Sequence, residues 1–139
     1  MSHASANRAF ASRVADVLRV HRVAVWYSSA NIVGAQQWHD EIGAALDRCD
    51  CFVVILSHAA VASPWVKREL IYALNDDRYG ERIVPIVHSR CDWARLSWTL
   101  DAIQMIDFRR SFEDGCRALL RVWGLAYRQV PSSGRTKRP

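Results

Sequence analysis

The sequence predicts an α/β fold, a doubly wound parallel sheet with helices on both of its faces. Short β-rich runs alternate with helical patterns along the chain, as in βαβ units. The run Cys51–Leu56 is apolar at every position, which is typical of a strand covered on both faces. Because 139 residues suit one ordinary domain and no repeat or linker divides them, we expect a single core.

The first part of the chain predicts helix, strand, loop and helix in turn. Apolar residues recur at helical spacing from Asn7 to about Val20. A β-rich run at Val23–Tyr27, a loop at Ser28–Gly34 and a helix at about Gln36–Arg48 follow. The apolar strand that comes next is expected at the centre of the sheet.

A third helix and a further strand are predicted after the central strand. Ser63 is a good N-cap and Pro64 suits the first helical position, so a helix should run to about Leu74. The run Ile83–Val87 reads as a strand. Its Pro85 favours an edge position or a strand end, because proline cannot donate to a sheet ladder.

The last third of the chain predicts three elements. We expect a weak, short helix around Trp93–Leu100 and an alternating edge strand at Ile103–Phe108. A final helix is expected at Phe112–Trp123.

The start of the chain departs from the usual pattern. A doubly wound domain normally opens with a strand, yet only Met1 and Ser2 precede the first helical region closely enough to serve as a stub. Either the sheet is short by its first strand, or the true start lies further upstream. In both cases the central strands lose a neighbour.

The net charge of +5 does not indicate a nucleic-acid partner, because most of it lies in one short segment. Four basic residues and no acid lie between Arg128 and Pro139, so most of the excess belongs to the C-terminal end. We therefore expect a folded domain at 1–127 and a basic disordered tail at 128–139, with nucleic acid an unlikely partner.

Membrane and cofactor signals are missing from the sequence. No apolar run of 18 residues and no secretory signal stand out, so a cytoplasmic protein without a membrane partner is expected. The four cysteines suit free thiols, and the histidines lack ligand spacing, so no metal site is expected. Ser57 and His58 lack the nucleophile elbow, and no glycine-rich phosphate loop is present.

Glu69 is the unusual charged residue of the third helix. At 100° per residue it falls inside an apolar arc, between Trp65 one turn before and Ala73 one turn after. Such a carboxylate either lies at the rim of the buried helix face, where it reaches water and pairs with an arginine, or lines a pocket. Because the helix begins just beyond the carboxyl end of the central strand, where open α/β sheets bind ligands, Glu69 and Trp65 are candidate site residues.

From Ser2 to Val87 the sequence resembles a Toll/interleukin receptor (TIR) domain of the bacterial type, with the first strand mostly missing. The resemblance rests on an ordered set of motifs rather than on any one of them. The motifs are Ser2–Ser5 with Asn7 and Phe10; Val25–Tyr27 with Ile32, Gly34 and Trp38; Leu56–Ser57; the W-x-x-x-E helix Ser63–Leu70; and Ile83–Ile86. The resemblance implies a flavodoxin-like sheet of about four to five strands.

The resemblance also implies a site. In active members the glutamate of W-x-x-x-E cleaves NAD+ at the nicotinamide–ribose bond, a role that falls on Glu69 here. Trp65 would shape the pocket, Trp38 would stack on a ligand base, and Ser2 and His3 would belong to the loop that closes over the ligand. NAD is then a substrate, and no resident cofactor is implied.

Two functions stay open at this point. One is a TIR-type NAD+ glycohydrolase, which the family places in signalling or anti-phage defence and which often becomes active on homo-oligomerisation. The other is a non-catalytic interaction module that self-associates through the 28–34 loop and helix faces. Glu69 favours the enzyme, whereas Ser28, where the family often carries an acid, and the reduced first strand favour the module.

Overall fold

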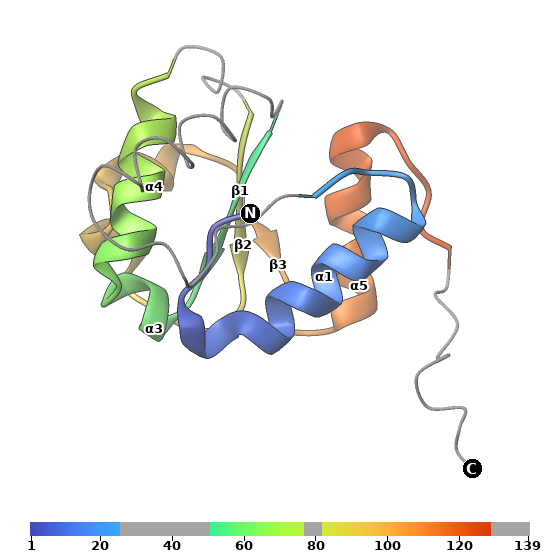
Figure 1. The fold of residues 1–139 in the computed structure, drawn as a ribbon, viewed down its shortest axis with the longest axis horizontal. Coiled ribbons are helices and arrows are strands. Elements are labelled where there is room, and N and C mark those ends of the chain that lie inside the picture. Colours follow the sequence, from blue (N-terminus) through green and yellow to red (C-terminus); the bar gives the residue numbers. More distant parts are fainter. Residues whose placement is uncertain (26–50, 77–81, 129–139) are drawn as a thin grey trace.

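A computed structural model describes residues 1–25, 51–76 and 82–128 of the chain (Figure 1). The helices are α1 (Arg8–Val20), α3 (His58–Val61), α4 (Pro64–Leu74) and α5 (Phe112–Leu120). Short 3-10 helices lie at Ser5–Asn7 (η1), Trp93–Arg95 (η3), Trp98–Ala102 (η4) and Arg121–Trp123 (η5). The strands are β1 (Phe52–Leu56), β2 (Ile83–Val87) and β3 (Ile106–Asp107).

The sheet is parallel, with its strands in the order β1-β2-β3. Phe52 is opposite Ile83 and Leu56 is opposite Val87, so β1 and β2 pair along their full lengths. Every residue of both strands is buried. The prediction that both faces of this strand are covered is therefore confirmed, because only a sheet covered on both faces buries consecutive side chains in this way.

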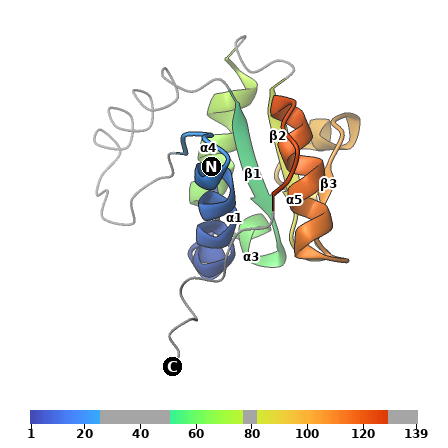
Figure 2. The ribbon, with the colours of Figure 1, turned by 90° about the vertical axis from the view of Figure 1, so that its right-hand side faces the viewer.

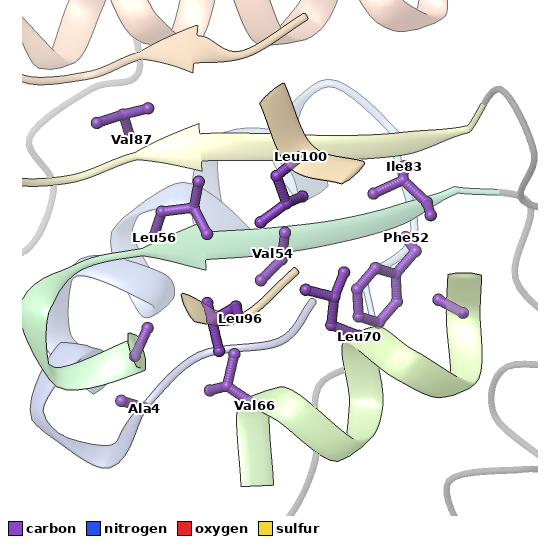
Figure 3. Close-up of a cluster of buried hydrophobic side chains, with 12 residues drawn as sticks. Ala4, Phe52, Val54, Leu56, Val66, Leu70, Ile83, Val87, Leu96 and Leu100 are labelled. Atoms are coloured by element: carbon purple, nitrogen blue, oxygen red, sulfur yellow. The ribbon is translucent and has the colours of Figure 1, made fainter. Parts of the chain in front are cut away.

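Helices cover the two faces of the sheet in two layers (Figures 1 and 2). One core lies between the sheet and α3, α4 and the η3–η4 segment, and Figure 3 shows Phe52, Val54 and Leu56 of β1 reaching into it. The other core lies between the sheet and α1 and α5, and takes Val53 from the same strand. The predicted α/β class with helices on both faces is confirmed.

Local signals at the start of α4 work as the sequence predicts. The Ser63 hydroxyl oxygen accepts a hydrogen bond from the Val66 backbone N–H at 3.2 Å, and Pro64 is the first helical residue. The helix ends at Leu74, with Asn75 as its C-cap. These bounds match the predicted helix.

The edge or strand-end position predicted for Pro85 is wrong, because β2 lies between β1 and β3 and Pro85 is the third of its five residues. Arg82 O and His88 N bond to β1, whereas Val87 O accepts from Phe108 on the β3 side. Hydrogen-bonding direction alternates along a strand, so Pro85 turns its nitrogen toward β3. Since β3 pairs only with Ile86 and Val87, it does not reach Pro85, and the missing donor breaks no ladder bond.

The expected first strand is reduced to a single parallel bridge between Ser2 and Val54. The Ser2 backbone N–H donates to Val53 O at 2.7 Å, and the Ile55 N–H donates to Ser2 O at 2.9 Å. The stub predicted at Met1 and Ser2 therefore occupies the position of a strand beside β1. The chain then passes through η1 into α1.

Several predicted elements fall on residues that the structure does not describe. The loop at 28–34, the helix at 36–48 and the second half of the 23–27 strand are among them. Val23 and Val25 are described; they lie outside any strand and pack against the α1–α5 core. The described sheet thus has three strands and one bridge, against the expected four to five strands.

The C-terminal third follows the predicted order with shorter elements. The weak helix appears as η3 and η4, the edge strand is the two-residue β3, and the last helix is α5 continued by η5. Beyond η5, the Arg128 N–H donates to His21 Nε2 at 2.8 Å, which ties this segment to the end of α1. No helix among the described residues is long and apolar enough to span a bilayer.

Candidate functional site

Glu69 lies inside the core on the α4 side of the sheet. It is the sixth residue of α4 and only 2% of its surface is exposed. Its helix neighbours Val66, Leu70 and Ala73 are fully buried, whereas Lys67 and Arg68 are exposed. Of the two alternatives that the sequence left open, the exposed rim is therefore excluded for this carboxylate.

Ser2 supplies a hydrogen bond to the buried carboxylate. Its hydroxyl donates to Glu69 Oε1 at 2.7 Å, and none of its own surface is exposed. Residues opposite one another in a bridge point to the same face of a sheet, and Val54 points into the α4 core. The bridge between Ser2 and Val54 therefore aims the Ser2 side chain at α4.

Of the other predicted site residues, the structure describes Trp65 and His3 but not Trp38. Trp65 is partly buried against the same core, one turn nearer the start of α4 than Glu69. His3 follows Ser2 and is nine-tenths buried, with Nδ1 2.9 Å from the carbonyl oxygen of Ala4. Trp38 lies outside the described residues. Among the predicted site residues, the structure thus joins Ser2 and Glu69 through a hydrogen bond.

Burial changes the proton affinity of His3. Desolvation lowers the pKa of this imidazole, and the positive charges of the N-terminus and Arg8 act in the same direction. The contact with the Ala4 carbonyl opposes them. His3 is therefore biased toward its neutral form at neutral pH.

A second buried polar pair joins the N-terminal segment to β1, and sequence reasoning did not single it out. The Ser57 hydroxyl donates to Asn7 Oδ1 at 2.6 Å and accepts from the Ala60 backbone N–H at 3.0 Å. Ser57 is the N-cap of α3, and His58 next to it is exposed. The hydroxyl of Ser57 is thus engaged in structure, in agreement with the rejection of a Ser57–His58 nucleophile pair.

The chemistry available at this site is that of a buried, oriented carboxylate. A carboxylate in a region of low dielectric stabilises positive charge that develops nearby far more than it would in water. Within residues 1–25, 51–76 and 82–128, no group of three or more histidine, cysteine, aspartate or glutamate side chains is arranged to hold a metal ion. The arrangement suits a reaction in which one carboxylate faces a cationic centre.

Comparison with known protein families identifies the chain. A family model described as TIR domain matches residues 1–120, from the N-terminal bridge to the last residue of α5. No curated protein matches the sequence. The family match confirms the resemblance predicted from the motifs, and the parallel sheet with helices on both faces agrees with it. The chain belongs to the TIR domain family.

Proposed function

We propose that this TIR domain hydrolyses NAD+ at the nicotinamide–ribose bond, with Glu69 as the catalytic residue. The observation that carries the proposal is the burial of Glu69 beside Ser2, at the helix position where active TIR domains hold their catalytic glutamate. A carboxylate enclosed in a hydrophobic core is a costly feature. A catalytic role accounts for that cost.

One carboxylate suffices for this reaction. A typical glycoside needs a second carboxyl group that protonates the leaving oxygen. Nicotinamide instead leaves as a neutral molecule from a ring that is already cationic, so no acid is required. Glu69 then stabilises the oxocarbenium-like ribose in the transition state, and water adds to the sugar carbon to give nicotinamide, ADP-ribose and a proton.

The neighbouring residues take supporting roles in the proposal. Trp65, one turn before Glu69, shapes the wall of the substrate site, and His3 and Trp38 contact the dinucleotide. Because Glu69 is buried, NAD+ reaches it only when the groups that cover it move. Association with other copies of the domain would favour the open arrangement and couple the activity to signalling or defence.

Release of nicotinamide by concentrated protein tests the proposal. We expect Glu69→Gln and Glu69→Ala to reduce the rate at least 100-fold, because a loss of ~3 kcal/mol of transition-state stabilisation has that effect. Glu113→Gln is the matched control, since Glu113 lies on the opposite face of the sheet in an ion pair with Arg117. Equal rates for the wild type and Glu69→Gln would contradict the proposal.

A non-catalytic interaction module is the second candidate, and one surface feature favours it. Trp98 of η4 is 78% exposed, and large exposed aromatic side chains are frequent at protein contacts. In this case the purified chain would self-associate in sedimentation velocity experiments without releasing nicotinamide.

A further inference from the structure

The backbone around Ser2 is fixed on both sides of the residue. Its N–H and carbonyl groups bond to Val53 and Ile55 at 2.7 and 2.9 Å, which sets the register of the N-terminal segment against β1. Ala4, two residues on, packs into the same core as Val54 (Figure 3). Ser2 is therefore held from both directions along the chain, which fixes the face of the sheet on which its side chain lies.

The Ser2 side chain ends at Glu69 in a region closed to solvent. The 2.7 Å between Ser2 Oγ and Glu69 Oε1 is a typical length for a hydrogen bond between two oxygen atoms. Neither residue exposes more than 2% of its surface. A serine hydroxyl has one proton to donate, and here that proton is directed at Glu69.

A glutamate side chain has three rotatable bonds, and its carboxylate can take many positions unless a partner holds it. Transition-state stabilisation depends steeply on that position, since a displacement of about 1 Å can cost a factor of about 100 in rate. We propose that Ser2 is a positioning residue that orients the Glu69 carboxylate without contacting substrate, an inference that rests on the proposed hydrolase activity. The N-terminal bridge is then part of the catalytic apparatus.

Ser57 provides a matched control for this inference. It is also a buried serine, its hydroxyl also donates to a buried side-chain oxygen, and it also lies beside β1. Its partner, however, is Asn7 rather than Glu69. Ser2→Ala removes a buried hydrogen bond from the carboxylate, whereas Ser57→Ala removes a buried hydrogen bond and the cap of α3 and leaves the carboxylate untouched.

The experiment compares steady-state NAD+ hydrolysis by the two variants and the wild type, below the unfolding temperature of each. We expect Ser2→Ala to lower kcat about 10- to 100-fold while KM changes less than about twofold. Ser57→Ala should leave both constants within about twofold. Ser2→Cys, which keeps the shape but substitutes a weak donor, should resemble Ser2→Ala more than the wild type.

The pH dependence of kcat adds a readout that a merely structural role would not change. A donated hydrogen bond favours the ionised form of a carboxylate. Its loss in Ser2→Ala should move the acid limb of the profile to higher pH, and Ser57→Ala should leave that limb in place.

Failure of this inference is distinguishable from failure of the proposed activity. If Glu69→Gln is inactive but Ser2→Ala matches Ser57→Ala, Glu69 is catalytic and Ser2 does not position it. If Ser2→Ala raises KM and leaves kcat unchanged, Ser2 is a substrate contact and the positioning role is wrong. If the wild type and Glu69→Gln are equal, the hydrolase proposal and this inference fall together.

Discussion

The two faces of the sheet bury different kinds of side chain. The α1–α5 face is filled by aliphatic side chains and by Phe108, and burial raises the pKa of the Cys116 thiol there to about 12. Charged groups stay at its margin, as Arg13 does over the ring of Phe112 at 4.0 Å. The α4 face encloses the carboxylate of Glu69 within an otherwise similar core. The α1–α5 face thus buries mainly apolar groups, whereas the α4 face also buries a carboxylate, which costs stability.

The largest effect expected from this contrast is that of Leu119→Ala. Leu119 is fully buried on α5, and truncating such a residue typically costs about 2–5 kcal/mol of unfolding free energy. Urea denaturation measures this loss. At a temperature where the variant is folded, its kcat for NAD+ should stay within about twofold of wild type. A folded but inactive Leu119→Ala protein would show that the two faces are coupled.

Gly115→Ala tests how tightly the α1–α5 face is packed. A Cβ at position 115 would lie 2.5 Å from the Phe108 ring, although alanine favours a helix by about 1 kcal/mol over glycine. We expect the clash to prevail and to lower the unfolding free energy by about 1–2 kcal/mol net. Adding Phe108→Leu should recover part of this loss. A Gly115→Ala protein more stable than wild type would show that the ring moves aside freely.

The smallest effect expected is a pH dependence of stability due to His3. Because burial lowers the pKa of His3 in the folded state, the unfolded chain binds the proton more readily. The unfolding free energy should therefore fall as pH drops below about 6.5, the ordinary value, toward the lower folded-state pKa. His3→Gln should flatten this slope in urea titrations from pH 7 to 5. The matched control is His58→Gln at an exposed position; an equal slope in both variants would contradict the assignment.

Local signals in the sequence were enough to predict much of the fold. Ser63 and Pro64 define the start of α4, and the unbroken apolar run of β1 indicates a sheet with two covered faces. The position of β2 was mispredicted because proline breaks a sheet hydrogen bond only where its nitrogen, which has no hydrogen to donate, faces a paired strand. That side depends on the length of β3, which lies some 20 residues further on and cannot be inferred from Pro85 itself.

The candidate site was predictable in part. Helical spacing placed Glu69 on the apolar arc of its helix but left a rim position and a pocket position open, and the burial of Glu69 excludes the rim. Its hydrogen bond to Ser2 was beyond the sequence, because the two residues are 67 positions apart and meet only through the bridge to β1. The Asn7–Ser57 pair was missed for the same reason, at a separation of 50 positions.

The bridge at Ser2 has a practical consequence for recombinant work. Met1 packs against the α1–α5 core, and the residue after it reaches Glu69. An affinity handle fused ahead of Met1 would therefore begin within two residues of the carboxylate, and the scar left after protease cleavage would stay there. A handle at the other end of the sequence leaves the residues next to Ser2 unchanged, so preparations meant for enzymology should carry theirs there.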